Sequence, residues 1–270
     1  MFCNKHEYYN SSTNQDLLTC VISAGKYASM VWIIAVIGCN ILLSLLWICF
    51  IFVTQRKRIK IKDPVLVVTA HPDDESMFFA PTILNLLYAG YDVDLLCLTT
   101  GDYNGLGQDR KLELSCATKK LGVRHLAIID SDKFKDGPNA SWSKEELVNF
   151  VCRTCQDFCS QSVISFDDYG VSGHKNHCTL GKVLKEARRD KLIPHLYCLR
   201  SVSTIRKYCF FIDLFLSILF AEKFICSPFK FIHLPYVSMY SHKSQLVWFR
   251  WLYMYFSVYM YKNSVIRYEV

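Results

Sequence analysis

The chain has 270 residues, which is enough for one good-sized domain and an appendage. Its composition is globular but leans apolar, with 51% hydrophobic and 14% aromatic residues, and this excess indicates membrane segments. Thirteen cysteines at irregular spacing in so long a chain exclude a small disulfide scaffold and are typical of free thiols in a reducing compartment. The net charge of +7 comes largely from local clusters, and we expect no nucleic-acid partner.

An uncharged apolar segment occupies residues 30–53, with the sequence MVWIIAVIGCNILLSLLWICFIFV. As a helix these 24 residues would extend over roughly 36 Å, which is enough to cross a bilayer with some tilt. A cleaved signal peptide fits less well, because the apolar run is too long and the residues before it include Glu7 and Asp16. The sequence therefore predicts one transmembrane helix at residues 30–53.

Basic residues directly after this segment predict its orientation. Residues 56–62 hold five lysines and arginines, whereas the 29 residues before the segment hold two lysines. By the positive-inside rule, we expect residues 1–29 to be a lumenal tail and residues 64–270 to be a cytosolic domain. The linker at residues 54–63 should lie against anionic lipid headgroups.

After the linker, apolar strands alternate with helices. Strands are predicted at 64–70, 91–99, 124–129, 162–166 and 195–200. Helices are predicted at 76–89, 109–121, 144–158 and 176–189. Apolar strands separated by helices of this length are typical of a mostly parallel sheet with helices on both faces. The sequence therefore predicts a Rossmann-like α/β fold, in which a ligand binds outside the carboxyl ends of the strands.

Two apolar segments in the last third, residues 208–221 and 247–261, are too short to span a bilayer comfortably. Both could be core helices. The aromatic density around Arg250 and Lys262 equally suits a surface at the membrane interface. The sequence does not decide between core helices and a surface at the membrane interface.

The first predicted strand ends abruptly in the acidic stretch His71-Pro72-Asp73-Asp74-Glu75. One explanation is the first turn of a helix, with Pro72 at its first position and the carboxylates opposite the positive end of the dipole. The other is half of a metal site, because a tight turn can aim His71 and Asp74 at one ion while Asp73 points elsewhere. A helix start alone would explain the carboxylates but not the presence of His71.

A second polar stretch, FDDYGVSGHKNH at residues 166–177, also follows a predicted strand. Both stretches should therefore lie at the same edge of the sheet, where His177 can complete a set with His71 and Asp74. Two histidines and one carboxylate with an open position are typical of catalytic zinc. They suit ferrous iron equally well, so the ligand types alone do not fix the metal.

The HPDDE and GHKNH motifs resemble those of the LmbE/PIG-L family of zinc-dependent de-N-acetylases. Further stretches are similar to its eukaryotic branch, which acts on N-acetylglucosaminyl-phosphatidylinositol in GPI-anchor synthesis. These stretches are TGDYN at 100–104 with RKLEL at 110–114, FDDYGVSGHKNH at 166–177, and HKSQLVWFR at 242–250. The resemblance covers about residues 64–263 and implies hydrolysis of an acetamide with release of acetate. It also implies an endoplasmic reticulum membrane location, with the catalytic domain facing the cytosol.

The resemblance implies roles for five residues of the two motifs. His71, Asp74 and His177 are the expected ligands of Zn²⁺, with another divalent metal as the alternative. Asp73 is the expected general base, which takes a proton from the attacking water. His174 is the expected residue that steadies the oxyanion or protonates the departing amine, which an amide needs in order to leave.

Four more residues have weaker assignments. Glu75 could support the ligands or act only as a charge at the start of a helix. Arg110 could contact a sugar hydroxyl or a phosphate, or it could be a solvated helix residue paired with Glu113. His242 and Gln245 resemble a family pattern near the pocket.

The predicted partner is a glycolipid substrate in the membrane, together with the anionic headgroups at the linker; no protein partner follows from the sequence. One alternative is deacetylation of another N-acetylglucosamine conjugate. A different class of protein would be a non-catalytic membrane scaffold that keeps the metal as a structural clip. The presence of Asp73 and His174, which ligation alone does not need, argues against the scaffold.

Overall fold

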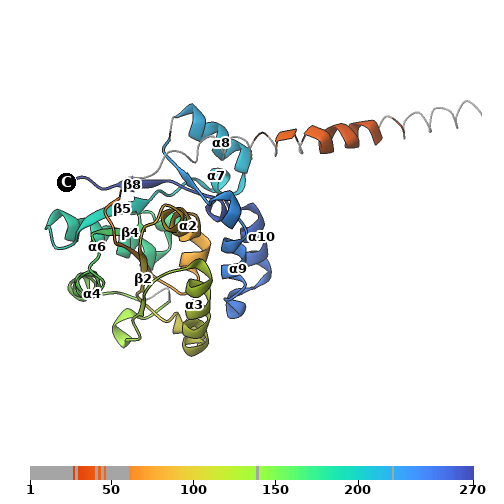
Figure 1. The fold of residues 1–270 in the computed structure, drawn as a ribbon. Coiled ribbons are helices and arrows are strands. Elements are labelled where there is room, and N and C mark those ends of the chain that lie inside the picture. The colour runs from red at the N-terminus through yellow and green to blue at the C-terminus, as the bar shows by residue number, and fades with distance from the viewer. Residues whose placement is uncertain are drawn as a thin grey trace, which may run out of the picture. The chain divides into compact units, whose positions relative to one another are not determined.

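The computed structural model describes residues 27, 30–39, 42, 43, 46, 61–137, 140–220 and 222–270 (Figure 1). The chain divides into two units, Met1–Thr54 and Gln55–Val270. Within the described part of the first unit, residues 30–39 are helical. No helix among the described residues has both the length and the apolar character needed to cross a membrane. The tail at 1–29 and the linker at 54–63 fall largely outside the described residues, and so do residues 40, 41, 44, 45 and 47–53 of the predicted span at 30–53.

A six-stranded sheet forms the centre of the second unit, with the strand order β3-β2-β1-β4-β5-β8. The five strands from β1 to β5 are parallel, and β8 is antiparallel to β5. Their bounds are β1 (Val65–Thr69), β2 (Val93–Cys97), β3 (Leu126–Ile128), β4 (Ser162–Phe166), β5 (His195–Leu199) and β8 (Val265–Arg267). The prediction of a mostly parallel α/β fold is confirmed. The sequence did not predict strand β8 or the small sheet of β6 and β7.

Helices cover both faces of this sheet (Figure 1). One face carries α4 (Lys144–Asp157) and α6 (Lys175–Arg189), which pack against each other. The other carries α2 (Ala80–Tyr88) and α3 (Gly107–Leu121), with α9 (Leu234–Met239) against α3. The remaining helices are α5 (Gly170–Gly173), α7 (Thr204–Tyr208), α8 (Phe210–Leu219) and α10 (Trp248–Phe256).

Short elements complete the chain. The 3₁₀ turns are η2 (Asp102–Asn104), η3 (Asp132–Phe134), η4 (Phe229–Phe231), η5 (Lys243–Gln245) and η6 (Val258–Met260). The small sheet pairs β6 (Ile225–Cys226) with β7 (Lys262–Asn263) in antiparallel fashion. The described cysteines are all free thiols, as expected from their spacing.

The strand order reverses at β1, because β1 pairs with β2 on one side and with β4 on the other. In open α/β sheets such a reversal separates the loops on either side and leaves a place for a ligand at the carboxyl ends. The HPDDE motif follows β1, and the FDDYGVSGHKNH motif follows the end of its neighbour β4. The fold therefore brings the two motifs to one edge of the sheet, as predicted.

The helix predicted from Ser76 begins differently, as the π-helix η1 (Glu75–Phe79) before α2 continues it. Pro81 lies in the first turn of α2 and has no N–H, so the carbonyl of Met77 cannot receive its α-helical hydrogen bond. The Tyr253 hydroxyl donates to that carbonyl instead, at 3.0 Å. The wider turn is thus supported by a side chain of α10, which the local sequence does not reveal.

Candidate metal and catalytic centre

The turn after β1 gives Asp73 and Asp74 different orientations. Oδ2 of Asp74 accepts hydrogen bonds from the backbone N–H groups of Ala70 (3.0 Å) and His71 (2.8 Å), which folds the turn back over the strand end. Asp73 has a φ of 113°, a strained conformation for a residue with a side chain. Only the surrounding contacts keep such a backbone in place, and they turn the Asp73 carboxylate away from its neighbour.

The loop after β4 fixes the position and the orientation of the His177 ring. The His177 ring stacks on Phe166 at a centroid distance of 4.0 Å, and its Nδ1 lies 3.2 Å from the carbonyl oxygen of Gly170. Gly170 has a φ of 58°, and a Cβ at this position would lie 2.4 Å from Cβ of His177. Glycine is therefore required here for both conformation and space, and Nε2 of His177 is left facing the β1 turn.

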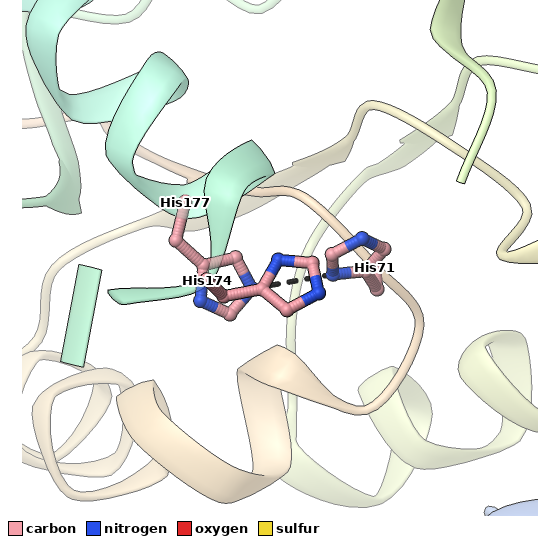
Figure 2. A group of neighbouring side chains, drawn as sticks. All are labelled: His71, His174 and His177. Atoms are coloured by element: carbon pink, nitrogen blue, oxygen red, sulfur yellow. Dashed lines mark hydrogen bonds between the residues drawn. The ribbon is translucent and has the colours of Figure 1, made fainter. Parts of the chain in front are cut away.

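The three predicted ligands converge, as Figure 2 shows for the two histidines among them. Nδ1 of His71 lies 3.2 Å from Nε2 of His177, and Oδ1 of Asp74 lies 3.3 Å from the same Nε2. Oδ2 of Asp74 is 3.7 Å from Nδ1 of His71. Ligand atoms at the corners of a tetrahedron with bonds of about 2.0–2.1 Å lie roughly 3.3 Å apart. The three side chains therefore fit around one divalent metal ion.

The charges of these groups also fit a cation. Although burial favours the neutral acid, His177 and His71 hold the pKa of Asp74 well below its usual range. Burial alone would lower the pKa of His71, but hydrogen bonds to Asp136 and Asp74 outweigh it and raise the pKa to about 9. A proton and a metal ion compete for the same nitrogen, so a site that attracts one also attracts the other.

His174 belongs to the same group, since its nearest ring nitrogen and those of His71 and His177 all lie within 4.8 Å of one another. It is the exposed member, whereas the other two are buried. Although the residue is exposed, its ring is partly desolvated, and this partial desolvation and the two neighbouring histidines lower the pKa of His174 to about 4. The structure thus puts His174 on the accessible side of the cluster, where a substrate would approach.

Asp73 is held apart from the ligands by two arginines. Its Oδ2 accepts a hydrogen bond from Arg250 at 2.9 Å, and its Oδ1 lies 3.8 Å from the Arg110 guanidinium. Burial and the nearby Asp74 carboxylate raise the pKa of Asp73, and Arg250 limits the rise. A buried carboxylate with a raised pKa next to a metal site is a suitable acceptor of a proton.

Arg110 is buried, so the interpretation that it is a solvated helix residue is wrong. It donates to the carbonyl oxygens of Gly101 (2.9 Å) and Pro72 (2.7 Å), so it joins the loops after β1 and β2. Glu113, the partner considered for it, instead accepts hydrogen bonds from the backbone and hydroxyl of Ser244. Arg110 therefore supports the turn that carries Asp73, and a contact with substrate stays a prediction.

Glu75 and His242 form a fully buried pair, with Nε2 of His242 2.7 Å from Oε1 of Glu75. The other carboxylate oxygen of Glu75 accepts the backbone N–H of Asp73 at 3.1 Å. Burial would lower the pKa of His242, but the Glu75 carboxylate raises it. The pair thus holds the strained Asp73 backbone, whereas Gln245 donates to Ser244 and is not brought to this cluster.

Three residues of the site had no assignment from the sequence. Oδ1 of Asp136 lies 3.2 Å from Nε2 of His71, and the Asn176 amide lies 3.1 Å from the same nitrogen. Arg250 is the third, through its bond to Asp73. Asn176 and Arg250 lie inside the motifs that resemble those of the family. This position in the sequence could have marked them as candidate site residues. Asp136 lies in the loop between β3 and α4, well past the strand end and outside every motif, so its position in the sequence does not single it out.

The chain is thus an α/β protein with a Rossmann-like sheet and a histidine-rich site at the carboxyl ends of its strands. N,N'-diacetylchitobiose deacetylase from Pyrococcus horikoshii superposes with a TM-score of 0.56 at 15% identity, over 76% of this chain and 83% of that one. A 4-carboxy-2-hydroxymuconate hydratase from Pseudomonas putida superposes with a TM-score of 0.55 at 13% identity, over 77% and 97%. These likenesses concern the fold alone.

The sequence comparisons narrow the class to one family. Residues 66–188 match the family model described as "PIG-L: GlcNAc-PI de-N-acetylase". N-acetylglucosaminyl-phosphatidylinositol de-N-acetylase from Bos taurus is 37% identical over 207 residues, which cover 74% of this chain and 81% of that protein. The chain therefore belongs to the PIG-L family of GlcNAc-PI de-N-acetylases, and the predicted family is confirmed.

Proposed function

We propose that this chain hydrolyses the acetamide of N-acetylglucosaminyl-phosphatidylinositol, giving glucosaminyl-phosphatidylinositol and acetate, a step of GPI-anchor biosynthesis. The observation that carries the proposal is the tetrahedral spacing of His71, Asp74 and His177 beside a separately held carboxylate, Asp73. The names of the family model and of the Bos taurus relative support the substrate. Zinc is the metal we expect, because nitrogen and carboxylate ligands in this number are typical of catalytic zinc.

When bound, the metal would polarise the acetamide carbonyl and lower the pKa of water. Asp73 would take a proton from the attacking water, because its carboxylate is oriented by Arg250 and not by the ligands. His174, on the accessible side of the cluster, would contact the oxyanion or protonate the departing amine. Breaking of the C–N bond then leaves acetate and a protonated glucosamine nitrogen.

We also propose that the last third of the chain lies at a membrane surface. The outward side chains of α10 are between 38% and 74% exposed, and all of them are apolar or aromatic: Trp248, Phe249, Trp251, Leu252, Tyr255 and Phe256. Exposed apolar side chains continue on α8, at Ile212, Phe215 and Leu219. Soluble surfaces do not normally gather such side chains, whereas tryptophan and tyrosine are enriched at membrane interfaces.

Charge favours the same location. Residues 201–263 contain seven lysines and arginines but two carboxylates, Asp213 and Glu222. Both carboxylates are paired with Arg206, at 2.8 and 2.7 Å, and their side chains are 1% and 7% exposed. The outer surface of this region therefore combines aromatic side chains with an excess of positive charge, which suits an anionic lipid surface. The proposal is consistent in its three parts. The substrate is in the membrane, residues 30–53 anchor the chain, and the catalytic domain lies on the cytosolic side of the endoplasmic reticulum.

The direct test is acetate release from N-acetylglucosaminyl-phosphatidylinositol by membranes that carry the full chain. We expect release that a chelator abolishes and zinc restores. His177→Ala should abolish release, whereas His125→Ala, which removes a half-exposed histidine at the opposite end of the sheet, should not. Release that is indifferent to chelators would exclude the metal-dependent mechanism, and failure to release acetate from any N-acetylglucosamine conjugate would exclude the activity.

A further inference from the structure

Lys207 in α7 is a buried lysine whose ammonium lies among aromatic rings. It is 7% exposed, and its ammonium lies 5.3 Å from the ring centre of Tyr208 and 5.5 Å from that of Tyr253. Within residues 61–137, 140–220 and 222–270, no carboxylate forms an ion pair with it. An ammonium taken out of water without a counter-ion is costly, and two aromatic faces offset only part of that cost.

The acidic groups that could have neutralised Lys207 are bound elsewhere. Asp213 pairs with Arg206 and Lys262, and Glu222 pairs with Arg206 and Arg200. A second cation, Arg250, stands on α10 three residues before Tyr253, whose ring the Lys207 ammonium contacts. Burial lowers the pKa of Lys207, and the positive charge of Arg250 lowers it further.

This pair of cations adjoins the candidate active site. Arg250 donates to Asp73 at 2.9 Å, and Tyr253, one turn further along α10, donates to the Met77 carbonyl at 3.0 Å. The Tyr253 ring lies between this contact and the Lys207 ammonium. Lys207 is therefore one side chain away from the turn that carries the predicted base, on a helix that packs against both α8 and α10.

We propose that Lys207 and Arg250 form an anion subsite that receives the phosphodiester of the lipid substrate while its acetamide lies at the metal centre. This inference rests on the proposed function, and it adds which residues recognise the phosphate. In that substrate, an inositol ring separates the sugar from the phosphate, so the anion must bind beside the catalytic groups and towards the membrane. An ammonium and a guanidinium are the two side chains that proteins use to bind phosphate oxygens. A bound phosphate would also supply the counter-ion that Lys207 lacks.

The test uses two water-soluble substrates that differ only in the phosphate: N-acetylglucosaminyl-inositol 1-phosphate and N-acetylglucosaminyl-inositol. The quantity measured is the ratio of their kcat/KM values, for the full chain in detergent micelles. Lys207→Gln should lower this ratio about tenfold to a hundredfold, as expected for loss of one charge-assisted hydrogen bond, and through KM more than kcat. Because both values come from one preparation, the fraction of folded enzyme cancels from the ratio.

Two further variants control the experiment. Lys207→Arg keeps the charge and should keep most of the preference for the phosphate-bearing substrate. Lys119→Gln removes the same charge from an exposed position near the far end of α3, and its ratio should equal that of the wild type.

Four results would overturn the inference. Equal losses on both substrates in Lys207→Gln would mean that Lys207 only joins α7 to α10 through its aromatic contacts. A loss that occurs only with lipid substrate in vesicles rich in anionic lipid would assign Lys207 to the bulk headgroups. A wild-type chain that deacetylates both substrates without preferring the phosphate would leave the proposed function standing and the subsite wrong, whereas no deacetylation at all would overturn both.

Discussion

The Arg250 guanidinium lies 2.9 Å from Oδ2 of Asp73, although 177 residues separate the two in the chain. The same guanidinium contacts Sδ of Met77, and Tyr253 from the next turn donates to the Met77 carbonyl. The helix α10 therefore fixes both the side chain of the predicted base and the π-helical turn behind it. Because α10 also carries the exposed aromatic face, the surface proposed to contact lipid is one helix away from the carboxylate of the predicted base.

Arg250→Met should lower kcat for the phosphate-free substrate N-acetylglucosaminyl-inositol about tenfold to a hundredfold, because loss of a charge-assisted hydrogen bond releases Asp73 from its orientation. This substrate separates the positioning of Asp73 from the recognition of phosphate. Arg153→Met, which removes an exposed arginine of α4, is the matched control and should keep the wild-type kcat. An unchanged kcat in Arg250→Met would show that Asp73 does not need this partner.

Asp73→Asn should retain the metal but lose about 10²- to 10⁴-fold in acetate release, the range attributed to a general base. Asp74→Asn should lose metal as well, because this carboxylate contacts both ligand histidines. Metal content per chain and acetate release, measured on the same preparations, separate the two roles. Near-normal turnover by Asp73→Asn would remove it as the base, and loss of metal would make it a ligand.

Asp136→Asn should weaken metal binding about tenfold to a hundredfold while every expected ligand stays in place, because groups that hold a ligating histidine tune its basicity and orientation. Asp136 is 3.2 Å from Nε2 of His71, the nitrogen that faces away from the ligand cluster. Titration with a metal-competing chelator measures the affinity directly. Asp130→Asn is the control, since Asp130 belongs to the same loop but pairs with Lys111 at the surface; equal affinities in the two variants would contradict the role of Asp136.

Much of the fold and of the ligand set could be predicted because the signals are local. Apolar strands followed by polar motifs determine where His71, Asp74 and His177 lie, and parallel strands bring their carboxyl ends to one edge. The adjacent aspartates were expected to point in different directions, and the turn after β1 separates them in this way.

The features without a sequence signal depend on contacts between distant segments. The π-helical start of α2 needs the hydroxyl of Tyr253, and Asp136 reaches His71 from a loop with no motif. Arg110 could be placed on a helix but its burial between two loops could not be foreseen, because burial depends on what the rest of the fold packs around it. Polarity and spacing identify a side chain that can do chemistry; they do not identify its partners.

Replacement of two exposed aromatic residues of α10, in Trp248→Gln/Phe249→Gln, should reduce activity on the lipid substrate in vesicles about tenfold or more. Each ring that enters the interface contributes on the order of 1 kcal/mol from its buried apolar area. The loss should be much smaller on the water-soluble N-acetylglucosaminyl-inositol 1-phosphate, because no membrane is involved. Tyr103→Gln/Leu112→Gln, which removes exposed apolar side chains elsewhere on the domain, is the matched control. Equal behaviour of the two double variants on vesicles would exclude α10 from the membrane contact.

Stability against acid should depend on Glu222, which anchors the helix that carries Lys207. Two hydrogen bonds from Arg206, at 2.7 and 3.0 Å, lower the pKa of Glu222 despite the opposing effect of burial. A carboxyl whose folded pKa lies below its unfolded value stabilises the protein above the unfolded pKa, about 4.3 for glutamate, and the effect is lost as the pH falls through the folded pKa. Glu222→Gln should therefore lower the free energy of unfolding by about 1–3 kcal/mol at pH 7. The difference from the wild type should shrink steadily below about pH 4.

Thermal unfolding of the full chain in detergent between pH 3 and pH 7 measures this dependence, with a shift of about 2–4 °C in Tm expected per kcal/mol for a domain of this size. Glu269→Gln, which removes an exposed carboxyl near the end of the chain, should leave Tm unchanged at each pH. A Tm difference for Glu222→Gln that stays constant down to pH 3 would mean that packing, and not the charge of Glu222, stabilises α7. In that case the aromatic rings around Lys207 would hold α7 in place, and the ion pair of Glu222 with Arg206 would not stabilise the helix.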